Sequence, residues 1–343
     1  MPVIVLMRHK HGMEDLDKLL ESRGQTAQLG AYVTAACFSP QGQAGFALGD
    51  GTVRRGGNFI PISAHNGATL SLSPHPKTGF IAGGDDGRLM HVAEEASEIA
   101  KFGSKWVGHT TTFAGKTPLI AAAVGKTVHL FTGNGEKLRE LTHNATVSGL
   151  TFDAKGKRLA TSHYNGASLW FTSSNSAPRV LEWKGSHTGI VMHPKDEAIV
   201  TSMQENALHG WTLPEGKHMR MSGYPAKTES LGFTKSGRWL ATAGAESVVL
   251  WPFFGGGPMG KAPTELGMGD GIVRRIACHP DHEVVAAGFD TGLTLLIHIN
   301  QGQILPLCGP GRGAITALAW SSTGSHLALG TETGFAALVD FTG

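Results

Sequence analysis

The feature that most constrains this chain is an internal repeat of about 40 residues. Each unit reads as a short apolar strand, a polar turn containing Pro or Gly, a strand of small and apolar residues, a second turn and a third strand. The apolar residue that closes the first strand recurs at intervals of about 34 to 45 residues, at Phe38, Leu72, Phe113, Phe152, Met192, Phe233, Cys278 and Trp320. Self-similarity at this period decides the architecture before any single motif does.

Three or four short strands in a unit of this length are typical of a four-stranded propeller blade. Helical repeats need apolar residues at a 3.6 period over ten or more positions, and these segments are too short and too rich in Thr, Val and Gly. A parallel βα fold needs helices between the strands, and only Glu14 to Leu20 looks helical. The 48 glycines fit a chain with many tight turns. The repeats predict an all-β, closed β-propeller of eight four-stranded blades, or seven if one segment is an irregular insert.

The last repeat lacks residues for an outer strand after its third strand, which ends near Phe341. An unpaired strand edge exposes backbone groups and invites aggregation, so another segment should complete the blade. Gln25 to Leu29 lies just before the first inner strand and is placed to do so. We therefore expect an N-terminal extension over residues 1–24 and a single propeller domain over residues 25–343, closed by an N-terminal strand.

Over roughly residues 25–341 the chain resembles the WD-repeat (WD40) β-propeller family. The resemblance rests on the apolar-Ser-Pro-x-Gly turns, on the Leu-Ala-Thr strands that follow them, and on the aromatic residues near the end of the third strand, namely Phe131, Trp170, Trp211 and Trp251. No Trp-Asp dipeptide occurs, and Val339-Asp340 is the nearest match. The family's His-Ser/Thr-Asp-Trp hydrogen-bond set is best matched in one repeat, by His143, Ser162, Asn165 and Trp170, and His65 with Asp86 is a partial second case.

Charge and cysteine content exclude several classes of protein. The 29 Lys and Arg nearly balance the 27 Asp and Glu, so the net charge of +2 indicates neither a nucleic-acid nor a membrane partner. The three cysteines have no CxxC spacing, which argues against a disulfide framework and a thiolate zinc site. No apolar run approaches the length of a membrane span, and the N-terminal apolar stretch is too short for a secretory signal. We expect a monomeric cytoplasmic protein.

Catalytic and cofactor motifs are missing from the sequence. There is no GxSxG elbow, and the segment Gly255–Lys261 lacks the hydroxyl residue and the helix that a phosphate-binding loop needs.

Three of the 17 histidines precede Pro at the end of a first strand, His75, His193 and His279, where other repeats carry Ser or Asp. Small polar residues at such positions bond nearby backbone, and we expect these histidines to do the same. We expect no enzyme, no cofactor and no metal. The role of the loop from Phe253 to Gly271 stays open.

The resemblance implies that partners bind where the inner strands begin, around the channel opening. Aligning the repeats places polar residues there, and aromatic and Arg side chains are enriched in interaction hot spots. The expected partner-binding residues are Tyr32, Trp106, His109, Trp183, Glu229 and Arg274. The competing interpretation is that the tryptophans pack between blades.

The resulting functional prediction is a non-enzymatic scaffold or adaptor that binds another protein. The alternative is a metal-binding or catalytic propeller in which channel histidines such as His109 and His187 converge. A third, weaker alternative is nucleic-acid binding through the basic doublets Arg54-Arg55 and Arg274-Arg275, which lack the interleaved aromatic residues of a single-strand track.

Overall fold

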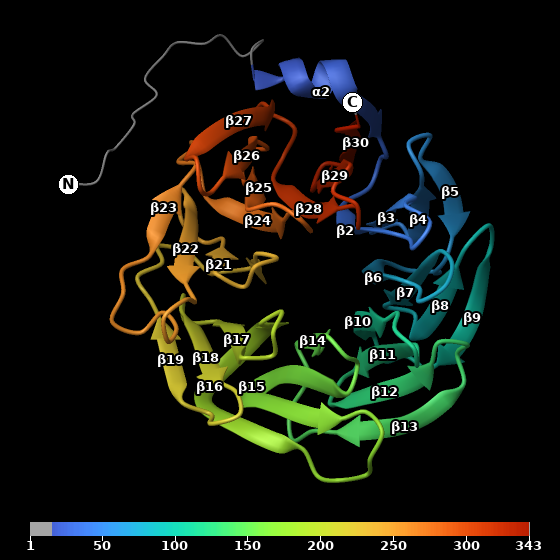
Figure 1. The fold of residues 1–343 in the computed structure, drawn as a ribbon. Coiled ribbons are helices and arrows are strands. Elements are labelled where there is room, and N and C mark those ends of the chain that lie inside the picture. Colours follow the sequence, from blue (N-terminus) through green and yellow to red (C-terminus); the bar gives the residue numbers. More distant parts are fainter. Residues whose placement is uncertain (1–15, 343) are drawn as a thin grey trace.

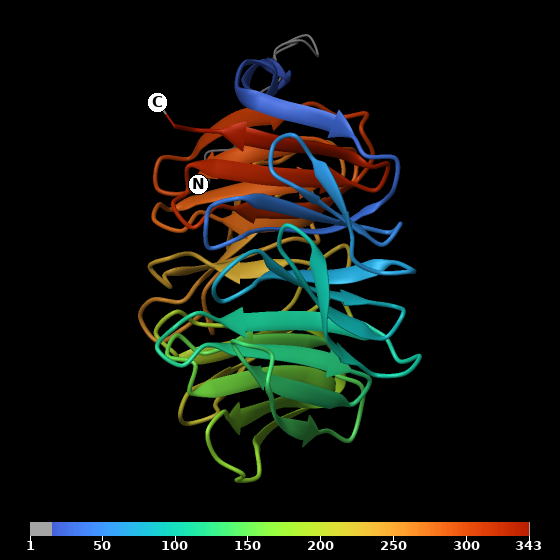
Figure 2. The same cartoon turned by 90° about the vertical axis from the view of Figure 1, so that its right-hand side faces the viewer.

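The sheets of the computed structural model, which describes residues 16–342, stand side by side around a common axis and close into a ring (Figure 1). Seen from the side, they run across the disc from one face to the other (Figure 2). The all-β closed propeller is therefore confirmed.

Each sequence repeat supplies an inner strand and the strands that follow it outward. Repeats 1 to 3 contain β2 (Val33–Phe38), β3 (Ala44–Leu48), β4 (Thr52–Arg55), β5 (Ile60–Ser63), β6 (Thr69–Pro74), β7 (Phe80–Gly84), β8 (Arg88–Val92), β9 (Ala96–Lys101), β10 (Val107–Phe113), β11 (Leu119–Val124), β12 (Thr127–Thr132) and β13 (Lys137–Thr142). Repeats 4 and 5 contain β14 (Gly149–Phe152), β15 (Arg158–Phe171), β16 (Arg179–Met192), β17 (Ala198–Met203), β18 (Leu208–Thr212) and β19 (His218–Met221). Repeats 6 to 8 contain β20 (Leu231–Phe233), β21 (Trp239–Thr242), β22 (Val248–Pro252), β23 (Thr264–Leu266), β24 (Val273–Cys278), β25 (Val284–Phe289), β26 (Thr294–His298), β27 (Gln303–Cys308), β28 (Ile315–Trp320), β29 (His326–Thr331) and β30 (Phe335–Asp340).

The number of sheets and the number of repeats differ by one. In the described residues, six sheets have four strands, and the seventh has six, in the order β14-β15-β16-β17-β18-β19. This sheet holds repeats 4 and 5. The strand β15 folds back on itself around Asn165 and Gly166, since Thr172 N donates to Lys157 O at 2.9 Å, and β16 pairs first with β15 and then with β17. Residues 16–342 therefore form seven sheets from eight repeats. The main prediction of eight blades differs from the structure by one, because β15 and β16 join repeats 4 and 5, and the alternative of seven is the count found.

The ring closes between the two ends of the described chain. Strand β1 (Gly24–Gln28) pairs antiparallel with β30, from Gly24 opposite Val339 to Gln28 opposite Phe335. It supplies the fourth strand of the last sheet from the segment expected to do so. A short helix, α2 (Lys18–Arg23), precedes β1, and its Leu20 is buried in the apolar cluster between repeats 7 and 8. The side chain of Asp17 accepts hydrogen bonds from both terminal nitrogens of Arg312 (3.1 and 2.8 Å) and from Gly309 N (2.7 Å).

The core of the described part of the chain consists of eight apolar clusters, each shared between neighbouring repeats around the ring. The second strands supply much of each cluster, because their residues are buried almost without exception, as in Leu119–Val124 and Ala198–Met203. Strands buried on both faces favour continuous runs of small and apolar residues. These are the Leu-Ala-Thr strands of the sequence.

Hydroxyl side chains donate hydrogen bonds to backbone carbonyl groups at the edges of several inner strands. The Thr34 hydroxyl donates to Thr69 O (2.6 Å), and the Ser73 hydroxyl donates to Thr110 O (2.9 Å). Thr316 bonds back to Val33 O (2.6 Å), across the closing seam. Each bond joins neighbouring repeats and gives one inner-strand carbonyl a hydrogen-bond partner, so repeats 8, 1, 2 and 3 are linked along their inner strands.

The antiparallel order gives the disc two distinct faces. One face, here called the hairpin face, carries the starts of the inner strands and the hairpins between second and third strands, such as Asp85–Gly87. The opposite face, here called the turn face, carries the turns that join each inner strand to its second strand, such as Asp153–Lys157. Among residues 16–342, no helix is long and apolar enough to cross a membrane.

Candidate functional site

Polar side chains at the hairpin tips hold the neighbouring loops of the hairpin face. Asp86 accepts hydrogen bonds from Asn66 N (3.0 Å), Arg88 N (3.1 Å) and Arg88 Nε (2.8 Å), and it contacts His65 Nδ1 at 2.9 Å. Burial raises the pKa of Asp86, but these hydrogen bonds outweigh burial and hold it far below its ordinary value. In later repeats, Asp290 and Glu332 form equivalent contacts. Their carboxylates accept hydrogen bonds from Ile272 N and Ala314 N, at 3.0 Å each.

The hydrogen-bond set expected in repeat 4 differs in two members. Trp170 Nε1 donates to His143 Nε2 (3.0 Å), and His143 Nε2 lies 2.9 Å from the hydroxyl of Thr161 rather than from Ser162. The Ser162 hydroxyl is buried without a hydrogen-bond partner. Asn165 stands apart from the set, at a hairpin position with φ 66°, where it accepts a hydrogen bond from Gly185 N (3.3 Å). The strand pleat sends adjacent side chains to opposite faces, so a shift of one residue decides which hydroxyl reaches the histidine.

Repeat 6 holds a second set that the sequence analysis missed. The Tyr224 hydroxyl lies 2.7 Å from Thr242 Oγ1 and accepts from Trp251 Nε1 (2.6 Å). Tyr224 thus replaces the histidine. The signal was present, because Tyr224, Thr242 and Trp251 have the same spacing in sequence as His143, Thr161 and Trp170. All members of the two sets except the partly buried Trp170 are buried, and both sets stabilise the join between the outer loop and the sheet.

Two expected partner-binding aromatics are accessible on the hairpin face. Trp106, which directly precedes β10, is 65% exposed, and Tyr32, which directly precedes β2, is 45% exposed. Most large apolar side chains of this protein are buried between repeats, so two exposed aromatic rings next to inner-strand starts are candidates for a contact with another molecule.

The expected residues Glu229 and Arg274 lie together. The Glu229 carboxylate pairs with Arg274 and Arg275 at 3.0 and 2.9 Å, and Arg275 Nε also donates to Thr316 O (2.8 Å) of the next repeat. Burial raises the pKa of Glu229, but the two guanidinium groups lower it below its ordinary value. This basic doublet is therefore partly committed to an ion-pair network that joins repeats 6, 7 and 8. The other doublet is also engaged, since Arg55 forms two hydrogen bonds to Glu94 (2.6 and 2.5 Å).

The remaining expected residues do not gather into one site. Trp183 stacks on the ring of His209, with centroids 3.9 Å apart and planes 11° apart, so it packs within the fold as the competing interpretation held. His187 is fully buried and bonds the Thr201 hydroxyl (2.7 Å) and Trp183 O (2.9 Å), so it does not reach the channel. His109, on inner strand β10, is accessible to solvent, and the surrounding protein lowers its pKa. Both ring nitrogens of His187 are engaged within the fold, so this geometry gives no support to a metal shared by His109 and His187, and that alternative stays a prediction.

The turn-face histidines act within the fold, as their place before Pro predicts. Nδ1 of His279 accepts from Asp281 N and His282 N (3.1 and 3.0 Å), while Nε2 lies 3.3 Å from Gly324 O in the next repeat. His193 repeats this arrangement, with Nε2 3.0 Å from Gly237 O. Within residues 16–342, no group of three or more His, Cys, Asp or Glu side chains could hold a metal ion.

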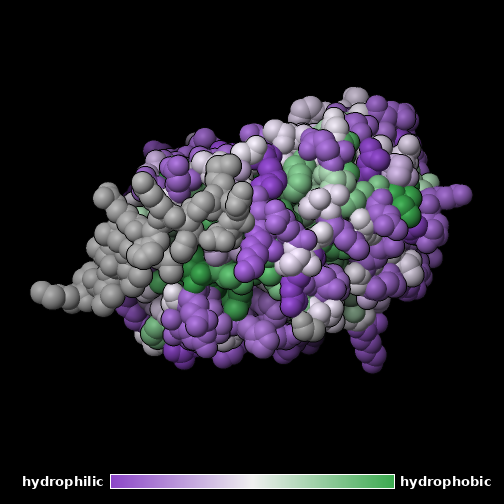
Figure 3. All heavy atoms as spheres, turned by 90° about the horizontal axis from the view of Figure 1, so that it is seen from above, coloured by the Kyte–Doolittle hydropathy of each residue, from purple (hydrophilic) through white to green (hydrophobic). Residues whose placement is uncertain are grey.

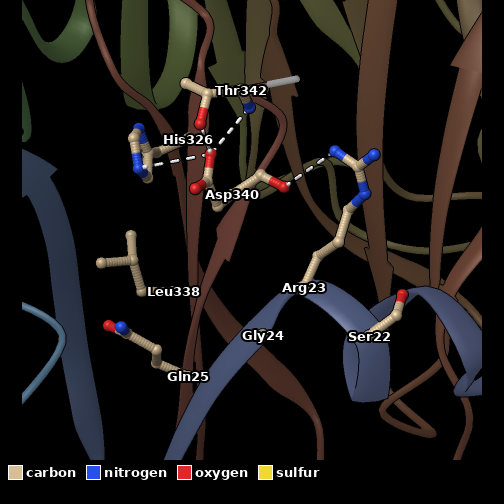
Figure 4. Close-up of a pocket in the computed structure, with 8 residues that line it drawn as sticks. All are labelled: Ser22, Arg23, Gly24, Gln25, His326, Leu338, Asp340 and Thr342. Atoms are coloured by element: carbon tan, nitrogen blue, oxygen red, sulfur yellow. Dashed lines mark hydrogen bonds and ion pairs between the residues drawn. The ribbon is translucent and has the colours of Figure 1, made fainter.

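A cavity of about 560 Å³ lies at the closing seam, between the start of β1 and the end of β30 (Figure 4). Its polar groups bond one another: Asp340 accepts from Thr342 N (2.7 Å) and lies 3.6 Å from His326 Nε2, and Arg23 Nη1 donates to Asp340 O (3.4 Å). These contacts around Asp340 stabilise the closing seam, and none of them pairs a nucleophile with a base.

The surface seen from the α2 side is mainly hydrophilic, with apolar areas between the polar ones (Figure 3).

Comparison with known proteins supports the fold and leaves the family open. No family model matches the chain. Telomerase protein component 1 of Rattus norvegicus is 25% identical over 223 residues, which cover 63% of this chain but only 8% of that protein. This chain therefore corresponds to a small part of its relative. The crystal structure of the computationally designed Ika8 protein superposes with a TM-score of 0.73 at 16% identity, covering 91% of this chain and 96% of the designed one.

Proposed function

We propose that this protein is a non-catalytic interaction scaffold that binds a protein partner on its hairpin face. The observation that carries the proposal is the exposure of Trp106 and Tyr32 beside the starts of two inner strands. An exposed indole and an exposed phenol offer large contact areas at a low cost in side-chain entropy. The propeller fold and the distant similarity to a segment of a much larger protein fit such a role, although a fold does not dictate its use. Cytoplasmic placement remains a prediction from the sequence.

The ion-pair network of Glu229, Arg274 and Arg275 would supply the polar part of the contact. The side chain of Arg274 is 42% exposed, so its guanidinium can bond a partner while it stays paired with Glu229. Polar groups at the rim of an interface contribute mainly to specificity and to the rate of association.

Lysine-directed crosslinking in native extract, followed by mass spectrometry, tests the proposal because the two faces carry different lysines. A partner on the hairpin face should crosslink to Lys105, Lys126 or Lys184, which are exposed there. The double variant Tyr32→Ala/Trp106→Ala should reduce capture of that partner by at least about tenfold. Phe171→Ala is the matched control, because Phe171 is an aromatic with 54% exposure at the end of β15. Equal capture by the double variant and the wild type, or crosslinks confined to turn-face lysines, would contradict the proposal.

A further inference from the structure

Five consecutive repeats carry a lysine in the turn between the inner and second strands. The positions follow one another every 39 or 40 residues, at Lys77, Lys116, Lys155, Lys195 and Lys235. All five side chains are exposed. Each of these turns joins the innermost strand of a repeat to its second strand. The five lysines therefore lie near the centre of the ring on the turn face, and we call them the lysine arc.

The local turn geometry fixes where the lysines stand. In repeat 4, Gly156 N donates to Asp153 O (3.1 Å), and Gly156 has φ 65°, a conformation that suits glycine. In repeat 5, Asp196 adopts the same conformation, with φ 60°, and Asp196 N donates to His193 O (2.8 Å). In these two repeats the lysine sits just before the residue that reverses the chain, and in repeats 2 and 6 it lies two positions before Gly79 and Gly237, which also have positive φ.

Neighbouring turns are also bonded to one another. Gln41 Nε2 donates to Lys77 O (2.6 Å), Ala154 N donates to Asp196 Oδ1 (3.3 Å), and His193 Nε2 bonds Gly237 O (3.0 Å). The backbone that carries the lysine arc is thereby held in place, so a ligand need not order it.

The charges of the arc are not neutralised by the fold. In the described part of the chain, Lys77 bonds the neutral amide oxygen of Asn134 (2.6 Å), and no hydrogen bond or ion pair engages the ammonium groups of Lys116, Lys155, Lys195 and Lys235. The acidic residues of these turns have other partners: Asp153 and Asp196 both contact Arg158, at 2.9 and 3.5 Å, and Glu197 lies 3.6 Å from His193. The turns of repeats 1, 7 and 8 carry no lysine, and repeat 7 carries Asp281 and Glu283.

We infer that the lysine arc binds an acidic protein segment, a stretch of chain rich in Asp or Glu that follows the turn face around the channel. A single nucleic-acid strand is the less favoured ligand, because such strands need aromatic rings on which bases stack. Phe113, Phe152 and Phe233, which lie two or three positions before lysines of the arc, pack on other aromatic rings instead, Phe113 on Phe152 (6.3 Å between centroids) and Phe233 on Phe253 (4.8 Å). This surface lies opposite the one in the proposed function, so either proposal can fail alone.

The test compares two sets of charge reversals that change the net charge equally. The arc variant is K116E/K155E/K195E, and the matched control is K105E/K126E/K184E on the hairpin face, with every lysine exposed. The probe is a labelled Asp-Ser repeat peptide, with an Asn-Ser peptide and a single-stranded oligonucleotide as comparisons. Fluorescence anisotropy at low and physiological salt gives the affinities.

We expect the wild type to bind the Asp-Ser peptide, to ignore the Asn-Ser peptide and to lose affinity as salt rises. The arc variant should bind at least about tenfold more weakly, and the control should change by less than about twofold. Equal weakening by both variants would overturn the proposal, as would no binding by the wild type. Tighter binding of the oligonucleotide that is lost only in the arc variant would assign the surface to nucleic acid and overturn the acidic-segment proposal as well. Circular dichroism of each variant establishes that the ring has folded.

Discussion

On the hairpin face, acidic side chains at the hairpin tips bond the backbone of the adjoining loop, as Asp86, Asp290 and Glu332 do. On the turn face, lysines at the turn tips of five repeats extend into solvent, and backbone bonds fix the turns without them. The comparison shows that acidic side chains hold loops on both faces, including Asp153 and Asp196 on the turn face, while the lysines at the turn tips remain available for binding. The net charge of +2 does not reveal this difference between the charged groups that hold loops and those that stay accessible.

The largest expected effect comes from deleting residues 1–30. The deletion removes β1 from the edge of β30 and removes Asp17, which holds Gly309 N and Arg312 on the hairpin face. Loss of a whole strand and of the buried Leu20 should lower the melting temperature by about 10 °C or more. Asp17→Asn is the milder control, because it weakens only the bonds to Gly309 and Arg312. An unchanged melting temperature after the deletion would show that β1 contributes nothing to closure.

The next effect in size is expected from Asp86→Ala. This change leaves the buried His65 ring and the Asn66 and Arg88 backbone amides without their shared acceptor. Breaking a hydrogen-bonded charge of this kind typically costs about 3–5 kcal/mol in the free energy of unfolding. Asp85→Ala is the matched control, since it alters the same hairpin at a side chain that makes no such bonds within residues 16–342. Urea denaturation of both variants measures the difference, and similar losses in the two would break the comparison between the faces.

A lower pH should destabilise the folded protein through both faces, because each face contains buried histidines. Burial lowers the pKa of His143 to about 4 and that of His75, on the turn face, to about 4. Both values lie below the ordinary pKa of a free histidine, about 6.5, so the unfolded chain binds protons first as the pH falls. Stability should therefore decrease from about pH 6.5 down to about pH 4, by at most about 1.4 kcal/mol per pH unit for each histidine. His143→Gln should flatten part of this slope in denaturation measured across the range. A wild-type profile that is level between these pH values would contradict the assignment of these histidines to the folded interior.

The smallest effect on stability is expected from the arc variant K116E/K155E/K195E. Exposed side chains without bonded partners change the free energy of unfolding by about 0.5 kcal/mol or less each. The melting temperature should therefore stay within a few degrees of the wild type. A large loss would mean that the lysines stabilise the turns, and it would remove the contrast with the hairpin face.

The sequence repeat was enough to predict the propeller and the turn histidines, because both depend on local patterns. The closing strand also followed, since an unpaired edge in the last repeat required a partner. The exact hydroxyl in the histidine set could not be assigned, because Thr161 and Ser162 are adjacent and only the strand register decides between them. Tyr224 was missed because a phenol was not considered in the place of an imidazole. Trp183 could not be assigned to surface or interior, since its neighbour His209 lies 26 positions later in the chain and only the fold brings them together.

The pairing of β1 with β30 also has a consequence for how the protein is made. Roughly 300 residues separate the two strands, so the ribosome needs about 15 to 60 seconds to produce the partner of β1 after β1 itself has emerged. During that interval the nascent ring is an open arc with two uncovered ends. Until β30 has been synthesised, those ends can contact other nascent chains, so slower translation should increase aggregation of the newborn protein.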